Sequence, residues 1–292
     1  MNPKVLIVIL NWNGKRDTIE CLNSLAKINY KNYGIIVVDN GSTDGSSEEI
    51  RKRFPKVKII KNRKNLGFAE GSNIGIKSAL RKKTDYVLLL NNDTVVEKNF
   101  LRNLVNISKR DDKIGIVCPK VYFYSTNKLQ YAGLKFNFKT GKSILEGYGE
   151  KDRGQFGKEK EMDFCGGTCM LVRKSVFENI GLLNEKYFAY YEDNDFGFRA
   201  RNAGYEIIFC PRAKIWHKIS RSTGGQTNPI KEYYMARNRI WLMKKYSPNL
   251  IIFWMHFIPE FLLGSLILAK KGKFDILKSK IKGATEGIWK SA

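Results

Sequence analysis

Short apolar runs alternate with helix-like stretches through the first third of the chain. The apolar runs are rich in Val, Ile and Leu and cover residues 5–10, 35–39, 57–60 and 86–90. The stretches between them have the polarity of surface helices and cover residues 17–27, 48–53 and 72–82. Continuous apolar runs separated by helices are typical of parallel strands buried on both faces of a sheet. We therefore predict a doubly wound, mainly parallel α/β sheet with flanking helices and with ligands at the carboxyl ends of its strands.

The pattern becomes less regular after residue 115. It predicts a hairpin over 134–145, short strands at 168–172 and 207–210, a helix beginning at Glu192, and a helix over 229–245. We therefore divide the chain into a globular part, residues 1–245, and a helical C-terminal segment, residues 246–292. The globular part divides again into residues 1–115 and residues 116–245.

Residues 250–269 form a second kind of apolar segment, in which 15 of 20 residues are apolar. Its length would allow a membrane span, but Pro259 and Glu260 lie at its centre. A carboxylate there costs roughly 2.5–3.5 kcal/mol on insertion scales. We predict two short helices hinged at Pro259 that lie at the surface of an anionic membrane, with the lysines of residues 270–282 facing the lipid. The alternative is a helix pair that packs on the protein itself.

The composition narrows the possible partners. The chain has 292 residues, a formal net charge of +24 and 43% hydrophobic residues, which excludes general disorder. The charge is compatible with nucleic acid, anionic lipid, a phosphorylated substrate, or merely a solvated surface. Of the 52 basic residues 37 are Lys, whereas the reading of base edges favours Arg. We expect no nucleic-acid partner, although a basic nucleic-acid-binding protein remains the alternative from another functional class.

The cysteines and the N-terminus indicate the compartment. Five scattered cysteines argue against a secreted disulfide framework, and Cys165 and Cys169 are expected to be buried thiols rather than zinc ligands. The first strand follows Met1 after three residues, without a signal peptide. We therefore expect a cytoplasmic location, peripheral on the inner face of the cell membrane.

Polar clusters follow the apolar runs at the expected strand ends. They are Asn11-Trp12-Asn13-Gly14, Asp39-Asn40-Gly41-Ser42-Thr43-Asp44-Gly45 and Asn91-Asn92-Asp93. Turn chemistry alone favours these residue types, but three clusters at one edge of a parallel sheet favour a binding site. A carboxylate in such a cleft suits Mg²⁺ or Mn²⁺ on a phosphate group, and Asp93 is well placed for it. His217 is a candidate nitrogen ligand, with a purely structural histidine as the alternative.

Six motifs in order carry a resemblance to a known family. They are Val5–Asn13, Val37–Gly45, Asn65–Asn73, Leu88–Thr94, Gly166–Arg173 and Phe188–Asp195. Together they resemble the inverting family 2 glycosyltransferases with the GT-A fold, in the subgroup that includes rhamnosyltransferases. The resemblance covers about residues 3–240 and implies a GT-A type sheet with a nucleotide-binding part before residue 115 and an acceptor-binding part after it.

The resemblance implies roles for residues of the nucleotide-binding part. Asp39 would contact the base of the nucleotide, with Asn11 and Asn13 in the same pocket. The loop Asn65–Asn73 would close over the nucleotide, with Gly67 allowing close backbone approach. Asn92 and Asp93 occupy the place of the family's D-x-D motif, where Asp93 would hold the metal. Asn91 stands where that motif has its first carboxylate, and His217 matches a position near the metal or diphosphate.

The resemblance also assigns the acceptor side. Gly166 and Gly167 would border the sugar and acceptor, together with Trp216. Independently of the resemblance, Arg237 and Arg239 are candidate cations that would stabilise the leaving diphosphate, with an exposed basic helix face as the alternative. In the pair Glu192-Asp193, Asp193 would be the general base, and Glu192 is either a second catalytic group or a residue of the first helical turn.

These assignments imply one reaction. A sugar would pass from dTDP-rhamnose or a UDP-sugar to a hydroxyl of a glycan or polyprenyl-linked acceptor, with Mg²⁺ or Mn²⁺ as cofactor. A catalytically idle GT-A-like binding protein is the remaining alternative, because of Asn91.

Overall fold

A ten-stranded mixed sheet forms the centre of the computed structural model, which describes residues 2–218 and 228–292. The four N-terminal strands are parallel: β1 (Val5–Asn11), β2 (Tyr33–Asp39), β3 (Lys58–Lys61) and β4 (Tyr86–Asn91). Next to β4 lies the antiparallel β11 (Cys169–Arg173), followed by the mutually parallel β6 (Ile114–Phe123) and β12 (Glu206–His217). The short strands at the margins are β5 (Thr94–Val96), β7 (Leu129–Tyr131) and β10 (Lys160–Glu161). The prediction of a doubly wound, mainly parallel sheet is confirmed, with one antiparallel strand inserted.

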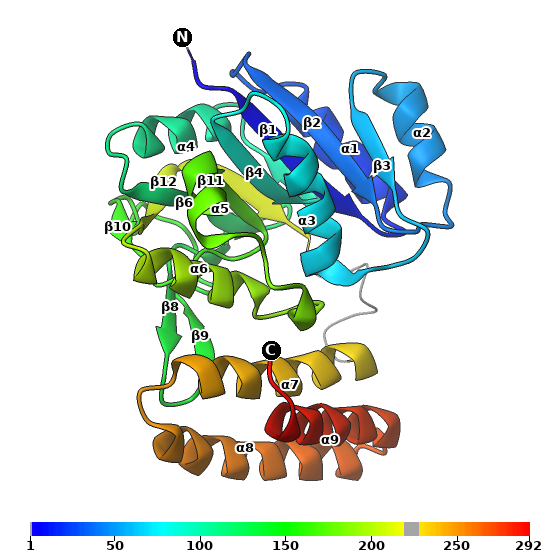
Figure 1. Ribbon diagram of the computed structural model, residues 1–292, viewed down its shortest axis with the longest axis vertical. Coiled ribbons are helices and arrows are strands. Elements are labelled where there is room, and N and C mark those ends of the chain that lie inside the picture. Colours follow the sequence, from blue (N-terminus) through cyan, green and yellow to red (C-terminus); the bar gives the residue numbers. More distant parts are fainter. Residues whose placement is uncertain (1, 219–227) are drawn as a thin grey trace.

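Helices cover both faces of this sheet (Figure 1). They are α1 (Lys15–Leu25), α2 (Ser46–Arg53), α3 (Gly67–Leu80), α4 (Phe100–Ser108), α5 (Lys174–Ile180) and α6 (Glu192–Asn202), with a short 3₁₀ helix at Glu185–Tyr187. Helix α3 packs on β1 and β2, on the face of the sheet that also carries α5 and α6 in Figure 1. The buried strands read as continuous Val, Ile and Leu because both of their faces meet helices.

Helix α3 begins earlier than the sequence indicated. It starts at Gly67 rather than near residue 72, so the segment Asn65–Asn73, which was expected to be a loop, is helical from Gly67 onward. Two glycines of this segment serve helix–sheet packing. A Cβ at Gly71 would lie 2.7 Å from the side chain of Leu10, and one at Gly75 would lie 2.3 Å from that of Val8. Close approach of α3 to β1 therefore requires these glycines.

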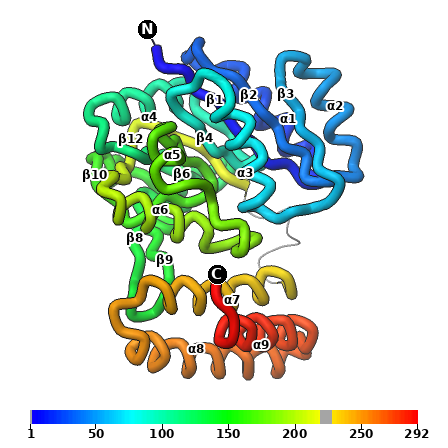
Figure 2. The backbone as a smooth tube through the Cα atoms, viewed as in Figure 1, coloured from blue at the N-terminus to red at the C-terminus, as the bar shows by residue number. Residues whose placement is uncertain are grey.

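Three C-terminal helices form a separate layer below the sheet part (Figures 1 and 2). These are α7 (Pro229–Tyr246), α8 (Leu250–Lys270) and α9 (Phe274–Trp289). A hairpin of β8 (Leu134–Asn137) and β9 (Lys142–Leu145) extends from the sheet part to this layer. Helix α9 packs tightly on α7, since a Cβ at Gly283 would lie 2.2 Å from the carbonyl oxygen of Tyr233.

Helix α8 corrects the expected hinge. Pro259 lies inside one continuous helix, where it removes a single backbone donor and does not divide the helix. Glu260 turns toward the protein and pairs with Lys142 at 2.7 Å and with Arg239 at 3.0 Å, so its charge is compensated. Within the described residues α8 is the one helix that is long and apolar enough to cross a membrane, and most of it is unburied. Ile251, Met255 and Leu262 are 72%, 70% and 61% exposed.

The cysteines differ in part from the expectation. Cys118 and Cys165 form a disulfide bond, so Cys165 is not a free thiol. Cys21, Cys169 and Cys210 are buried free thiols, as expected for Cys169. Sequence spacing could not indicate this pair, because the two cysteines are 47 residues apart and meet only through the folding of β6 beside the segment that leads into β11.

Candidate active site

A cavity of about 1240 Å³ extends from the carboxyl ends of β1 and β4 to the helical layer of α7, α8 and α9. Eight of the residues singled out from the sequence line it: Asn65, Gly67, Asn92, Asp93, Gly167, Glu192, Asp193 and His217. Six others lie outside the lining: Asn11, Asn13, Asp39, Gly166, Trp216 and Arg237. The strand-end clusters thus meet at one edge of the sheet, as expected for α/β folds.

Asp93 and His217 form a contact pair at the sheet side of the cavity. Asp93 follows β4 and His217 ends β12, and the antiparallel pairing of β5 with β12 brings these ends together. His217 Nε2 lies 3.1 Å from Asp93 Oδ1, and both side chains are about 10% exposed. On its other side, His217 Nδ1 lies 2.8 Å from Gln130 Oε1. Gln130 therefore fixes the orientation of the imidazole ring, and sequence reasoning missed it.

The donor set of this pair fits a divalent cation. Adjacent ligands of an octahedral ion with bonds of about 2.1 Å lie about 3 Å apart, close to the observed Asp93–His217 separation. Among the described residues no group of three or more His, Cys, Asp or Glu side chains gathers at one point. Two protein ligands suit Mg²⁺ or Mn²⁺, which complete their coordination with water and substrate phosphates.

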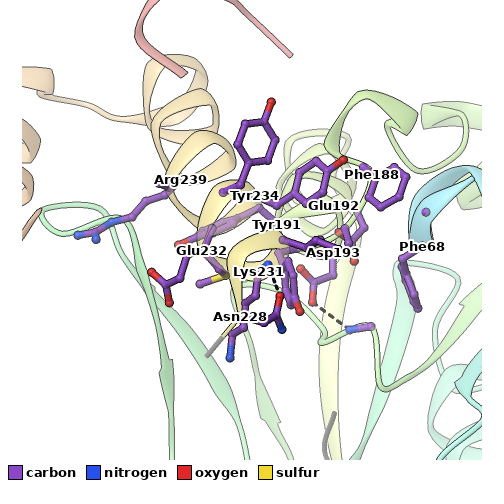
Figure 3. A pocket seen from close by; sticks show the side chains of 18 of the residues that line it. Phe68, Phe188, Tyr191, Glu192, Asp193, Asn228, Lys231, Glu232, Tyr234 and Arg239 are labelled. Carbon is purple, nitrogen blue, oxygen red and sulfur yellow. Dashed lines mark hydrogen bonds between the residues drawn. The ribbon is translucent and has the colours of Figure 1, made fainter. Parts of the chain in front are cut away.

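Glu192 and Asp193 begin helix α6 and line the same cavity. Asp193 Oδ2 accepts a hydrogen bond of 2.9 Å from the Gly167 N–H, and its Oδ1 accepts one of 2.8 Å from the Asn194 N–H (Figure 3). These contacts fix the carboxylate at the cavity wall. Glu192 is 5% exposed, and its Oε2 has no hydrogen-bond partner among the described residues.

The environment of this pair makes both carboxylates more basic. Burial raises the pKa of Asp193, although the N–H groups of Gly167 and Asn194 act in the opposite direction. Burial, followed by the neighbouring Asp193 charge, raises the pKa of Glu192 well above its ordinary value. A raised carboxylate pKa at a cavity wall is typical of groups that accept or donate protons. We call Asp93, Glu192 and Asp193 the acidic end of the cavity.

Asn11 and Asp39 support the wall of the cavity from behind. Asn11 is fully buried, and its amide donates to Ser46 Oγ at 2.9 Å while its Oδ1 accepts from Thr18 Oγ1 at 2.7 Å. Asn92 Nδ2 donates to the same Asn11 Oδ1 at 3.3 Å. Asp39 accepts hydrogen bonds from the Ser42 N–H and from Ser47. The side-chain polar atoms of Asn11 are therefore occupied by the protein.

Asn40 is a second residue that sequence reasoning missed. It is 1% exposed, donates to Asn65 Oδ1 at 2.9 Å and to the Gly67 carbonyl at 3.0 Å, and accepts from the Leu66 N–H. The N–H of Ala69, in the first turn of α3, donates in turn to the Phe188 carbonyl at 3.1 Å. These contacts tie the segment Asn65–Gly67 and the start of α3 to the segment that carries Glu192 and Asp193.

Arg237 is buried and Trp216 is half-buried, and neither residue lines the cavity. The guanidinium of Arg237 lies 4.0 Å from the ring centroid of Trp241 and donates to the Lys186 carbonyl at 2.8 Å. Trp216 stacks on Tyr122 and donates to the Thr126 carbonyl at 3.2 Å. The alternative prediction, that Arg237 lies on an exposed basic helix face, is wrong because this residue is only 7% exposed. Its neighbour Arg239 lines the cavity instead.

Comparison with known proteins agrees with this architecture. The sequence profile of the family described as Glycosyl transferase family 2 matches residues 6–181. The chain is 24% identical over 301 residues to dTDP-rhamnosyl transferase RfbF of Shigella flexneri, which covers 99% of this chain and 96% of the relative. It is 25% identical over 227 residues to N-acetylglucosaminyl-diphospho-decaprenol L-rhamnosyltransferase of Mycobacterium tuberculosis, covering 70% of this chain and 72% of the relative.

A solved structure shares the fold. The mannosyltransferase PcManGT from Pyrobaculum calidifontis, in complex with GDP-Man and Mn²⁺, superimposes with a TM-score of 0.62 at 14% identity, over 99% of this chain and 88% of the other. This likeness is one of fold and supports the GT-A architecture. The profile match covers more than half of the sequence and includes Asp93 at the end of β4, while Glu192 and Asp193 lie just beyond it. The chain therefore belongs to glycosyl transferase family 2.

Proposed function

We propose that this glycosyltransferase moves a sugar from a nucleoside-diphosphate donor to a hydroxyl of a glycan or polyprenyl-linked acceptor, with inversion at the anomeric carbon. One observation carries the proposal: the Asp93–His217 pair and the Asp193 carboxylate line the same cavity and come from different elements of the fold. A donor diphosphate and an attacking hydroxyl can therefore occupy the two sides of one reaction centre. The names of the two rhamnosyltransferase relatives favour dTDP-rhamnose as donor, with a UDP-sugar as the alternative.

Asp193 is proposed to be the general base. An acceptor hydroxyl is a weak nucleophile at neutral pH, and its proton passes to a carboxylate oxygen of Asp193 as the oxygen attacks the anomeric carbon. The N–H groups of Gly167 and Asn194 hold that carboxylate in place. Burial, which raises the pKa of Asp193, strengthens it as a base. Glu192 lies beside it, and its buried position favours the protonated form.

Asp93 and His217 are proposed to hold Mg²⁺ or Mn²⁺ against the donor diphosphate. When bound, the cation stabilises the negative charge that develops on the leaving nucleoside diphosphate. Gln130 orients His217 for this role, and Asn92 is held in the cavity wall by the hydrogen bond that it donates to Asn11. Asn65, Gly67, Asn13 and Asp39 are proposed to form the nucleoside side. Gly166, Gly167 and the nearby aromatic and basic residues are proposed to shape the acceptor side.

The proposed location is the cytoplasmic surface of an anionic membrane. Helix α8 exposes apolar side chains over most of its length, and the exposed lysines Lys270, Lys271, Lys273 and Lys278 lie next to it along the chain. An interfacial helix of this kind binds lipid through its apolar area, and each nearby lysine adds about 1 kcal/mol at an anionic surface. This placement brings a lipid-linked acceptor to the cavity. No nucleic acid partner is proposed.

A donor panel tests the proposal. Purified full-length protein is incubated with dTDP-rhamnose, UDP-sugars and GDP-mannose, each with Mg²⁺, Mn²⁺ or EDTA, and the release of nucleoside diphosphate is measured. We expect release with one donor class, strong dependence on the divalent cation, and inverted anomeric configuration of the product by NMR. Neither transfer nor hydrolysis with any donor would favour the catalytically idle alternative, and a retained configuration would exclude the single displacement.

A further inference from the structure

The part of the cavity that the hairpin and the helical layer line has a chemistry that the proposed reaction does not use. Its lining includes Lys142 from β9, Arg239 from α7 and Lys280 from α9, and we call these three residues the basic end. Figure 3 shows Glu192 and Asp193 between Arg239 on one side and Phe68 on the other. At about 1240 Å³ the cavity exceeds the ~300–1,000 Å³ usual for one small ligand, so a second ligand group has room beside a donor.

Two of the three cations have a carboxylate partner. Glu260 pairs with Lys142 at 2.7 Å and accepts from both terminal nitrogens of Arg239 at 3.0 and 3.1 Å. Arg239 also donates through Nε to the Thr140 carbonyl at 2.8 Å and is only 8% exposed. Glu260 therefore serves to fix Arg239 and Lys142 at the rim, with one negative charge shared between two positive ones.

Lys280, the third cation of the basic end, contacts an aromatic ring of α8. Among residues 2–218 and 228–292 no carboxylate forms an ion pair with it, and its Nζ lies 5.1 Å from the ring centroid of Phe261. The residue is partly buried against α8, since a Cβ at Gly264 would come within 2.5 Å of that Nζ. Burial lowers the pKa of Lys280, and the positive charges of Arg239 and Lys142 act in the same direction, against the attraction of Glu232 and Glu260. A bound anion would relieve this excess of positive charge.

The surroundings of Lys280 indicate what kind of anion fits. Phe257 and Phe261 of α8 line the cavity beside it, with ring centroids 5.6 Å apart. On the same helix the neighbouring Ile258 and Leu262 are 50% and 61% exposed to the outside. A phosphate at Lys280 could therefore continue into an apolar chain that follows α8 toward the lipid. The ligand chemistry is that of an amphiphile with a phosphate head.

We propose that the basic end, with Lys280 as its central cation, binds the phosphate or diphosphate that joins a lipid chain to the acceptor sugar. This inference rests on the proposed function and identifies the acceptor as an isoprenyl phosphate or diphosphate conjugate. Charge and geometry give the acceptor one orientation: the lipid chain on α8, the phosphates at the basic end, and the sugar hydroxyl toward Asp193. The carboxylates of the acidic end repel the acceptor phosphate, whereas the cations of the basic end attract it.

Binding of farnesyl diphosphate, compared with farnesol, tests the site without any turnover. The full-length protein is titrated in EDTA, so that no cation is available at Asp93 and His217, and binding is followed by calorimetry. We expect farnesyl diphosphate to bind at least tenfold more tightly than farnesol. Lys280→Gln should abolish that preference, Lys280→Arg should keep it, and Lys139→Gln, which removes an exposed hairpin lysine outside the lining, should leave it unchanged. Equal affinity of wild type and Lys280→Gln for farnesyl diphosphate would overturn the proposal.

Two further arms separate the alternatives. If Lys280→Gln does not fold, as judged by its thermal melt, Lys142→Gln at the exposed rim should still weaken farnesyl diphosphate binding several-fold, and no weakening would count against the site. Flotation with phosphatidylglycerol vesicles should be the same for Lys280→Gln and wild type. A loss of vesicle binding without a loss of farnesyl diphosphate binding would assign Lys280 to a bilayer headgroup and overturn the proposal.

The outcome is independent of the donor panel. If no donor is turned over but farnesyl diphosphate binding depends on Lys280, the phosphate site stands and the proposed reaction fails. If transfer occurs but binding does not depend on Lys280, the reaction stands and the assignment of the acceptor phosphate fails.

Discussion

The two ends of the cavity hold their charges in opposite ways. At the acidic end Glu192 is buried with an unpartnered Oε2, and burial raises the pKa of both Glu192 and Asp193. At the basic end Glu260 has two cationic partners. Burial raises its pKa, but the hydrogen bonds from Arg239 and Lys142 outweigh this and lower the pKa below its ordinary value. The carboxylates of Glu192 and Asp193 can therefore exchange protons, whereas Glu260 remains a charged structural anion.

This difference separates two tasks within one cavity. A proton acceptor must not be neutralised by a permanent cation, so Asp193 is held by neutral backbone N–H groups. A phosphate-binding cation must be held in place and still carry excess charge, so Glu260 compensates only part of the basic end. The comparison predicts that changes at the acidic end alter kcat, whereas changes at the basic end alter the affinity for a phosphorylated acceptor.

The largest expected effect is at Asp193. Asp193→Asn keeps the size of the side chain and an acceptor for the Gly167 N–H but removes the base, so kcat should fall roughly 10²–10⁴-fold. Initial rates over a range of donor and acceptor concentrations measure this, with a thermal melt as the control for folding. Lys280→Gln is the matched change at the basic end and should raise the acceptor KM with little change in kcat. If Asp193→Asn kept more than a tenth of the wild-type kcat, the division of tasks would be wrong.

A smaller effect is expected at Gln130, which touches the cavity only through His217. Gln130→Leu leaves the imidazole in place but removes the partner of Nδ1, and loss of such an orienting contact typically costs 10–100-fold in metal affinity. Titration of activity with Mn²⁺ should show a raised half-saturation concentration and a nearly normal rate at saturation. An unchanged Mn²⁺ titration would mean that His217 does not act at the metal. The basic end provides the control, since Lys142→Gln should not shift the titration.

The sheet side of the acidic end, at Asp93, could be predicted from the sequence because the ends of parallel strands follow a simple rule. Parallel strands place their carboxyl ends at one edge, so the clusters at Asn11, Asp39 and Asp93 had to converge. The same rule does not say which side chains face the ligand. Asn11 is turned inward, and its polar atoms form hydrogen bonds with Ser46 and Thr18. These contacts depend on the packing of α1 and α2.

The basic end could not be predicted in this way. Lys142, Arg239 and Lys280 come from three elements that are about 40 to 140 residues apart, and no periodicity links them. The sequence showed Glu260 as an isolated carboxylate in an apolar segment, and for that reason a hinge at Pro259 was expected. Its partners Arg239 and Lys142 appear only in three dimensions, and with the charge compensated a continuous helix is stable.

The apolar face of α8 gives the next prediction, which concerns how the basic end is reached. Replacing the exposed Ile251, Met255 and Leu262 together by Asn removes apolar area that would enter the lipid, so vesicle binding should fall roughly tenfold or more. Flotation with phosphatidylglycerol vesicles measures this, and Tyr148→Asn on the sheet part should have no effect. The rate with a water-soluble acceptor should not change. A loss of that rate would show that the substitutions disturb the cavity itself.

The smallest effect is expected on stability, and its sign distinguishes the two ends. The pKa of Glu192 is raised in the native state, so between the ordinary value of about 4.3 and the raised one the native state binds more protons than the unfolded state. The free energy of unfolding contributed by Glu192 therefore falls as the pH rises. Glu192→Gln removes this penalty and should stabilise the protein increasingly with pH, by up to about 1.4 kcal/mol per pH unit within that window.

Glu260→Gln is the matched change and should act in the opposite direction. The pKa of Glu260 is lowered, so its stabilising contribution is present above the ordinary pKa and disappears as the pH falls through the lowered one. This variant should be less stable than wild type at pH 7 and equal to it in strong acid. Urea unfolding of both variants between pH 4 and 8 measures the two trends. If Glu192→Gln destabilised the protein at neutral pH as Glu260→Gln does, Glu192 would have a stabilising partner in the fold, and the contrast between an uncompensated acidic end and a compensated basic end would not hold.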